Sequence, residues 1–345
     1  MAAPKPVNQG ILSFPRVLPF FFPVVFLYFL TPTLRETWSS WVLSRNDNHL
    51  SELSRAALSE KSWLSSVQKR HEWMNANKDY DSILFTARDE SLRFWYTIWD
   101  LFPATYTCPW DVQRVGKLGD GGKWICRMSK YERAKPKSRA SEKPIRIYSF
   151  GIGNDSSFEA EMLNRSSAAE MYGFDDTVDG WGKGLEAYPN RTHFFKTAVA
   201  EYDYYDEKEK TEFLSIKSIM QKLGHDYVDL VKMDIEGDEF PTLESFLGDY
   251  AKGGELEGKE VPVGQMVIEI HVPEKGPKIS QFAEWWERIE EVGFRPVWSE
   301  ANLLAVTVGD GKPCCFEYTW INTKDSRGVT WERGYKALRE HAAAM

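Results

Sequence analysis

The sequence predicts a doubly wound α/β fold whose sheet is mostly parallel, with an antiparallel last strand. From Ile145 onward, strand and helix patterns alternate regularly, which is typical of a parallel sheet built from strand–helix–strand units. The segment Val228–Met233 is nearly all apolar, as expected for a strand that is buried on both faces. The last strand patterns follow a final helix and place the antiparallel element at the end of the chain.

Length and composition exclude several classes of protein. At 345 residues the chain has about two domain lengths. Its 43 basic and 51 acidic residues give a net charge of −8, which excludes a general nucleic-acid binder. A mean hydropathy of −0.46 excludes a multi-pass membrane protein. Four cysteines exclude a disulfide scaffold, and 42% hydrophobic residues exclude bulk disorder.

One apolar run departs from this soluble pattern. Residues 17–34 carry no charge and, as a helix, reach about 27 Å, close to the thickness of a hydrocarbon core. A cleaved signal peptide is the main alternative, but no small-x-small cleavage pattern follows Leu30. We therefore expect an uncleaved signal anchor. The protein would then be a single-pass membrane protein of the endoplasmic reticulum or Golgi with a lumenal catalytic domain.

The chain divides into five predicted parts. These are an N-terminal tail and anchor (1–35), a helical stem (36–106), a Gly-Asp-Gly-Gly segment with a basic linker (107–143), the α/β domain (144–325) and a C-terminal tail (326–345). In the stem, Leu50, Leu53, Ala57, Leu64 and Val67 form a helical stripe. This stripe indicates either packing onto the main domain or self-association.

The strands and helices of the α/β domain follow in order. Strand patterns cover 145–150, 171–175, 194–200, 228–233 and 266–270, followed by late strand patterns at 294–298, 303–308 and 315–321. Helix patterns are marked by Phe158, Met162 and Leu163; by Ile216, Ile219, Met220 and Leu223; by Phe240, Leu243 and Leu247; and by Ile279, Phe282, Trp286 and Ile289. Gly293 suits the end of the last helix.

The first strand runs into a glycine turn. Gly151 and Gly153 allow a ligand to approach the backbone at a helix start, where Ser156 and Glu159 match a capping box. Asp175 follows 24 residues after Gly151, near the position of a carboxylate that binds a nucleotide ribose. Because Ser156 stands where a dinucleotide fingerprint has its third glycine, S-adenosyl-L-methionine fits better than NAD.

Polar side chains also end the other strands. Asp234 and Glu236 follow the fourth strand, and Glu269 and His271 lie at the end of the fifth. Ligands of doubly wound sheets bind at the carboxyl ends of the strands, so these groups should share one site with the glycine turn.

At this point the sequence resembles a known family. Residues from about 107 to 322 are similar to the FkbM-related, methyltransferase-like group of class I S-adenosylmethionine-dependent methyltransferases. The resemblance rests on Gly119–Cys126, Ile147–Asp155, Val231–Glu239, Val267–His271 and Glu317–Asn322, of which the Lys-x-Asp-x-Glu-Gly-x-Glu string is the most specific. It implies a seven-stranded sheet with an antiparallel last strand and methyl transfer, usually to oxygen.

The resemblance also assigns residues. It implies that Gly151, Gly153 and Asn154 form the cofactor loop, that Asp175 binds the ribose and that Asp234 lies beside the methionine moiety. The acidic residue that usually precedes the glycines is replaced by Tyr148 or Ser149.

Methyl transfer to a hydroxyl needs a general base. His271 is the preferred base, with Asp234 as the second choice. Glu236 is a further catalytic candidate or, alternatively, a cap of the next helix. The alternative that Asp234, Glu236, Glu239 and His271 bind a divalent cation lacks a defined ligand geometry, so no metal is expected. The expected acceptor is a hydroxyl-bearing small molecule or a glycan, and no nucleic-acid partner is expected.

Two other functions remain open. A type II membrane glycosyltransferase using a nucleotide sugar would share the anchor, stem and α/β domain, with Asp175-Asp176 or Asp234-x-Glu236 as its acidic pair. The glycine turn argues against it. A degenerate domain that only binds ligands is the third interpretation.

Cysteines and glycosylation signals bear on the compartment. Cys108 and Cys126 would form a disulfide in an oxidising lumen and stay reduced in a cytosol. Cys314 and Cys315 are adjacent in a predicted strand and are not expected to pair with each other. Of the three Asn-x-Ser/Thr signals, Asn154 should stay bare because it lies in the cofactor loop, whereas Asn164 and Asn190 are candidates for glycans.

Overall fold

The computed structural model describes residues 32–82, 98–135, 144–272, 277–304 and 314–328, with side chains described from residue 54 onward. Residues 1–53 and 54–345 form two compact units. The described residues of the first unit are helical and belong to α2 (Pro32–Ala76), which continues into the second unit.

The predicted anchor, residues 17–34, lies mostly outside the described residues. Within the part of the chain that the structure describes, no helix combines the length and the apolar character needed to cross a bilayer.

A seven-stranded sheet organises the second unit. Its strands are β3 (Ile145–Phe150), β4 (Ala169–Phe174), β5 (Thr192–Phe195), β9 (Val228–Met233), β10 (Val263–His271), β11 (Phe294–Ala301) and β12 (Cys315–Asn322). They lie in the order β11-β12-β10-β9-β3-β4-β5. The pairs formed by β3, β4, β5, β9 and β10 are parallel, and β12 is antiparallel to both neighbours. The predicted mostly parallel sheet with an antiparallel last strand is confirmed.

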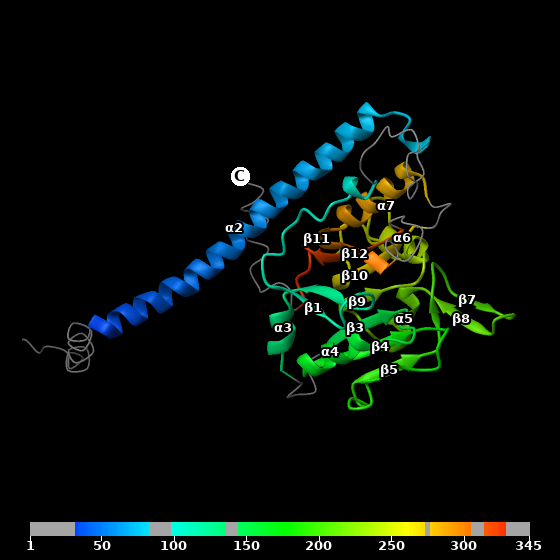
Figure 1. Ribbon diagram of the computed structural model, residues 1–345, viewed down its shortest axis with the longest axis horizontal. Helices are drawn as coiled ribbons and strands as arrows, with labels where there is room; N and C mark the ends of the chain where they lie inside the picture. The colour runs from blue at the N-terminus through cyan, green and yellow to red at the C-terminus, as the bar shows by residue number, and fades with distance from the viewer. Residues whose placement is uncertain (1–31, 83–97, 136–143, 273–276, 305–313, 329–345) are drawn as a thin grey trace, which may run out of the picture. The chain divides into compact units, whose positions relative to one another are not determined.

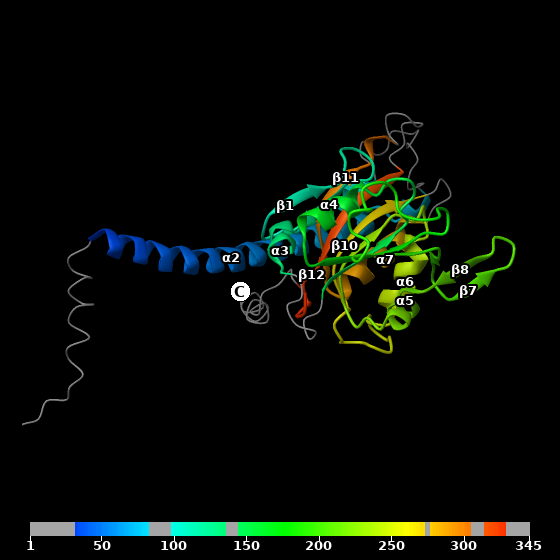
Figure 2. The same cartoon turned by 90° about the horizontal axis from the view of Figure 1, so that it is seen from below.

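Helices cover both faces of this sheet (Figure 1, Figure 2). One face carries α5 (Ile216–Leu223), α6 (Glu239–Gly248) and α7 (Ile279–Glu291), and the other carries α3 (Met128–Arg133) and α4 (Ser157–Arg165). The helix patterns explain this arrangement, because the apolar positions of α5 and α7 recur on one side of each helix and are buried. All six residues of β9 are buried, as the central strand of a doubly covered sheet must be.

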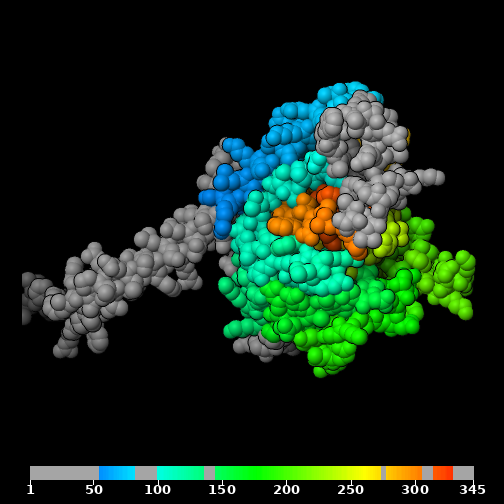
Figure 3. Space-filling model, viewed as in Figure 1, coloured from blue at the N-terminus to red at the C-terminus, as the bar shows by residue number. Residues whose placement is uncertain are grey.

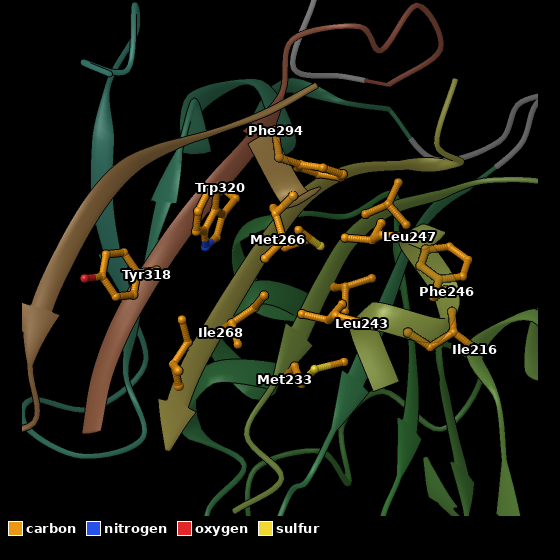
Figure 4. Close-up of a cluster of buried hydrophobic side chains, with 14 of the residues drawn as sticks. Ile216, Met233, Leu243, Phe246, Leu247, Met266, Ile268, Phe294, Tyr318 and Trp320 are labelled. Atoms are coloured by element: carbon orange, nitrogen blue, oxygen red, sulfur yellow. The ribbon is translucent and has the colours of Figure 1, made fainter. Parts of the chain in front are cut away.

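The larger core lies between the sheet and α5–α7. Figure 4 shows side chains of β9, β10, β11 and β12 gathered against those of α5 and α6. From α7, the Trp286 ring meets Trp320 of β12 edge-on at 4.3 Å between ring centroids. Burial of each such large side chain stabilises the fold by roughly 1.5–3 kcal/mol, which fixes the strands that carry the site.

A hairpin beside the sheet carries the Gly-Asp-Gly-Gly turn. It consists of β1 (Val112–Val115) and β2 (Lys123–Cys126), which pair antiparallel. Cys126 is disulfide-bonded to Cys108, one of the two states that the sequence left open, and its backbone N–H donates to Gln265 Oε1 of β10 at 2.9 Å. The surface of this region, drawn in teal, continues into that of residues 145–214, drawn in green (Figure 3). The hairpin is thus tied to the sheet and places its turn near the strand ends.

The second half of α2 packs against this unit. Trp63 Nε1 donates to Glu290 at 2.7 Å, and Arg70 pairs with the same carboxylate at 2.8 Å. The Arg295 guanidinium lies 3.4 Å from the centre of the Trp63 ring. Residues 54–76 therefore pack onto the main domain through Trp63 and Arg70 rather than through the predicted stripe, in which Leu64 is 55% exposed. Short 3-10 helices follow at Tyr80–Ser82 and Ile98–Leu101.

The predicted strand 194–200 is divided in the structure. β5 ends at Phe195, where Thr197 N–H turns back to the Phe195 carbonyl at 2.9 Å. The chain then enters a small second sheet of β6 (Ala198–Val199), β8 (Thr211–Leu214) and β7 (Tyr204–Asp206). This sheet was not predicted, because β6 is too short to give a periodic pattern.

Three local predictions need correction. The Ser156–Glu159 capping box does not form, because Ser156 Oγ accepts from Gly182 N–H and Glu159 accepts from Ser149. Cys314 and Cys315 are disulfide-bonded to each other; side-chain alternation does not separate them because β12 begins only at Cys315. Of the predicted strand 303–308, the first two residues are helical and the rest lie outside the described residues.

Candidate functional site

A cavity of about 580 Å³ opens at the carboxyl ends of β3, β4 and β9. Each loop that follows these strands contributes to its wall, and the turn of the β1–β2 hairpin adds another side. The residues that border it include Gly151, Ile152, Gly153, Asn154, Asp175, Asp176, Asp234, Glu236, Lys117, Asp120 and Gly121. The structure therefore brings together the predicted cofactor loop, Asp175 and Asp234, as expected for ligands of a doubly wound sheet.

Gly151 fixes how closely two strand ends approach. Its φ is +71°, and a Cβ at this position would lie 1.8 Å from the carbonyl oxygen of Asp234. Only glycine can therefore occupy the position. Gly153 also has a positive φ, +56°, but no atom lies within 4 Å of its virtual Cβ. The first glycine is required by packing and the second by backbone conformation alone.

Asp175 holds the glycine turn in place. Its Oδ2 accepts the N–H groups of Ile152 at 2.7 Å and Gly153 at 2.8 Å, and its Oδ1 accepts from the backbone and hydroxyl of Thr177. Burial opposes ionisation, but these hydrogen bonds keep the pKa of Asp175 below its usual range. Both oxygens are already used, so the carboxylate acts here as a positioning group. Its contact with a ribose stays a prediction, and Asp176 beside it also borders the cavity.

The remaining residue of the predicted cofactor loop, Asn154, is exposed and borders the cavity. A ligand seated on the glycine turn would meet its side chain.

A buried cluster of charges lies behind Asp234. The fully buried ammonium of Lys123 lies 3.2 Å from Asp234 Oδ2, 3.2 Å from Glu269 Oε2 and in contact with Glu317. Burial alone would lower the pKa of Lys123, but the three carboxylates raise it well above its usual range. Burial raises the pKa of Glu317 to about 8.

Asp234 links this cluster to the cavity. Burial opposes its ionisation, yet Lys123, Lys232 and His271 hold the pKa of Asp234 below its usual range. The carboxylate is thus ionised at neutral pH. It is suited to meeting a positive charge and is a weak proton acceptor.

His271 lies across from Asp234, as the sequence predicts. Its Nδ1 lies 3.0 Å from Glu239, and its Nε2 lies 3.7–3.9 Å from Asp234, Glu236 and Glu269. Burial favours the neutral ring, but the surrounding carboxylates raise the pKa of His271 to about 9. The imidazole is therefore protonated at neutral pH in this arrangement. It can serve as a base only after that proton is lost, so its catalytic role stays a prediction.

Glu236 and Glu239 have different roles at the next helix. Glu236 has a left-handed backbone with φ of +57° and an exposed side chain. The loop N–H groups of Ile235 and Gly237 donate to Glu239, each at 3.0 Å. Glu239 therefore stabilises the loop before α6, whose N-terminus has no side-chain cap. The capping role considered for Glu236 is not observed, and Glu236 instead borders the cavity, 3.7 Å from His271 Nε2.

Some of these groups could hold a metal. The donor atoms of Asp234, Glu236 and His271 lie within 4.8 Å of one another, and those of Glu269, His271 and Cys315 form a second such group. Cys315 is disulfide-bonded and His271 is protonated, so a cation would have to displace that proton.

Sequence analysis gave several residues of the site no role in it. Lys123, Lys232 and Glu317 lie in segments that carry the family resemblance, so their positions could have been singled out. Lys232 hydrogen-bonds to the Gly151 carbonyl and is one of two charged residues in the buried strand β9. Glu159 was assigned only to a helix cap, whereas it borders the cavity.

Two curated proteins are similar to part of this chain. The chain is 26% identical over 205 residues to Probable methyltransferase-like protein 24 of Homo sapiens, a match that covers 53% of this chain and 51% of that protein. The rat protein of the same name, from Rattus norvegicus, is also 26% identical over 205 residues, covering 53% and 52%. The chain thus spans about half the length of these curated relatives.

A solved structure of methyltransferase FkbM from Methylobacillus flagellatus is 12% identical, with 71% of this chain and 59% of that chain covered at a TM-score of 0.35. This likeness is too distant to carry an argument.

A family described as a methyltransferase domain matches residues 57–321, which is more than half of the chain. The matched residues include the sheet, the glycine turn and the buried charges around Lys123. The chain therefore belongs to this methyltransferase domain family.

Proposed function

We propose that this protein is an S-adenosyl-L-methionine-dependent methyltransferase that transfers the methyl group to a hydroxyl oxygen. The observation that carries the proposal is the convergence of the glycine turn, Asp175 and Asp234 on one cavity of about 580 Å³. That volume lies within the ordinary range for cofactor sites. When bound, S-adenosyl-L-methionine supplies an electrophilic methyl group on a positively charged sulfur.

The charge of the cavity suits this cofactor. Among the residues that border it, eight are acidic and two are lysines. Such a wall favours a ligand with a net positive charge. Gly153, whose Cβ position has no atom within 4 Å, leaves the backbone of the glycine turn open to that ligand. A nucleotide sugar is anionic, so the same wall disfavours the glycosyltransferase alternative.

Asp234, which borders the cavity, and His271, which lies beside Asp234 but is not among the bordering residues, suggest how the acceptor would be handled. Asp234 faces the cavity with a negative charge beside the expected sulfonium, and His271 lies 3.9 Å from its Oδ1. A nearby positive charge would lower the pKa of His271 and favour the neutral ring. His271 would then accept the proton of an acceptor hydroxyl. In-line placement of acceptor and methyl group would supply much of the rate.

A methyl-transfer assay tests this proposal. The full chain is incubated with methyl-labelled S-adenosyl-L-methionine and a panel of hydroxyl-bearing small molecules and glycans, together with amines and thiols. We expect label in an acid-stable, base-stable ether product with the wild type and a large loss with Asp234→Asn. Label on nitrogen or sulfur acceptors alone would refute the choice of oxygen.

We also propose a lumenal location. The Cys108–Cys126 disulfide and the exposed positions of Asn164 and Asn190 support it. Protein from native membranes should gain mobility after treatment with an N-glycosidase, and the double variant Asn164→Gln/Asn190→Gln should not. Unchanged wild-type mobility together with alkylation of both cysteines without reductant would place the domain in the cytosol.

A further inference from the structure

The end of β3 lacks the carboxylate that the family resemblance leads one to expect. Ser149, two residues before Gly151, stands at this place and has no charge. Its hydroxyl donates to Glu159 Oε1 at 2.6 Å. A carboxylate from the first turn of α4 thus lies against the strand position where the acidic side chain is missing.

Glu159 is buried and incompletely paired. The residue is 1% exposed and borders the cavity, and its Oε2 has no hydrogen-bond partner among the described residues. Its Oε1 also lies 4.0 Å from the ammonium of Lys232, which itself hydrogen-bonds to the Gly151 carbonyl. A buried carboxylate oxygen without a donor is costly, and a ligand that brings an N–H group would remove that cost.

Within the methionine moiety of the proposed cofactor, the ammonium is the group that fits this oxygen. The sulfonium has no N–H to donate, and the cofactor's carboxylate would be repelled. The ammonium is positively charged and has three donors. It also belongs to the amino-acid end of the cofactor, which is the part that an acid at the end of β3 would hold.

We infer that Glu159 replaces the missing acid of β3 and that its Oε2 binds the primary ammonium of the cofactor's methionine moiety. This inference rests on the proposed function, because it names a contact to the same cofactor. Ser149 orients the carboxylate, and Lys232 offsets its charge while the cavity is empty. The alternative is that Glu159 only balances Lys232 inside the fold.

Binding of two ligands by the full chain separates these cases. S-adenosyl-L-homocysteine carries the ammonium, and its desamino analogue has hydrogen in place of that group. We expect the wild type to bind the desamino analogue about tenfold or more weakly by isothermal titration calorimetry. In Glu159→Gln the affinity for S-adenosyl-L-homocysteine should fall by a similar factor, and the preference between the two ligands should nearly vanish.

Glu161→Gln is the matched control. Glu161 lies on the same helix, pairs with Arg165 at 3.0 Å and is not among the residues that border the cavity. This variant removes the same charge and should keep the wild-type preference for the ammonium. Equal weakening of both ligands by Glu159→Gln would assign Glu159 a structural role and overturn the inference.

Two further outcomes are decisive. If Glu159→Gln does not fold, the wild-type comparison alone decides, since equal affinities for the two ligands would mean that no group holds the ammonium. If the wild type binds neither ligand, the proposed function itself fails, and this role fails with it.

Discussion

Gly151 and Asp234 are packed so closely that a methyl group on Gly151 would overlap the Asp234 carbonyl oxygen at 1.8 Å. The end of β3 can therefore contact the end of β9 only because residue 151 has no side chain. This contact brings the glycine turn and the carboxylate of Asp234 to the same cavity, on which the proposed cofactor site depends.

The variant Gly151→Ala should disrupt the site far more than Gly153→Ala. The first forces the two loops apart, whereas the second adds only the strain of a left-handed backbone, roughly 1–2 kcal/mol. We expect a clear fall in melting temperature and loss of S-adenosyl-L-homocysteine binding for Gly151→Ala. Equal effects of the two variants on melting and binding would show that the close approach is unimportant.

Asp175→Ala should weaken cofactor binding by roughly 1–3 kcal/mol, because the glycine turn loses its charge-assisted hydrogen bonds. Asp176→Ala provides the comparison, since Asp176 borders the same cavity. If Asp175 acts only by holding the turn, its loss should lower stability and affinity together. The pKa of Asp175 is depressed, so its stabilisation should disappear as the pH falls through that lowered value. Calorimetric titrations and acid melts measure both effects.

His271 should give kcat/KM for the cofactor a rising pH profile. Its pKa in the free protein is raised to about 9, and only the neutral ring can accept a proton, so kcat/KM should increase as pH rises toward that value. His271→Ala should lower kcat strongly while cofactor affinity stays near wild type. A wild-type kcat/KM that is flat from pH 6 to 9 would remove His271 as the base.

The raised pKa of His271 also predicts that the stability of the fold decreases as pH rises, whereas activity increases. The protonated ring is stabilised by Glu239, Asp234 and Glu269, so its contribution is complete below about pH 6.5 and is lost as pH rises through about 9. The stability difference between wild type and His271→Gln should therefore shrink over this range. Chemical denaturation at several pH values measures that difference.

Lys123→Met should destabilise the domain by about 3–5 kcal/mol, because it leaves Asp234, Glu269 and Glu317 buried without their cation. Lys117→Met is the matched control on the same hairpin. Lys117 is half exposed and pairs with Asp155 at 3.2 Å, so its loss should cost at most about 1 kcal/mol. Urea unfolding of the two variants would contradict this account if their midpoints were the same.

The sheet could be predicted because each strand and helix carries its own periodic pattern. The short strand β6 could not, since two residues give no period. Asp175 and Asp234 were found because they end strands, a position that is readable from the sequence. The pairing of Lys123 with Glu317 could not be predicted, because the two residues are 194 positions apart and neither stands out from the other charged residues of the sequence. Glu159 matches the sequence pattern of a capping box, and only the structure shows that its carboxylate accepts a hydrogen bond from Ser149 instead.

Isothermal titration of the full chain with S-adenosyl-L-methionine and, separately, with a nucleotide sugar such as UDP-glucose shows whether the cavity beside Gly151 and Asp234 binds the proposed cofactor. We expect saturable binding of S-adenosyl-L-methionine, abolished by Gly151→Ala, and no heat from the nucleotide sugar. Binding of the nucleotide sugar without any binding of S-adenosyl-L-methionine would overturn the proposed function.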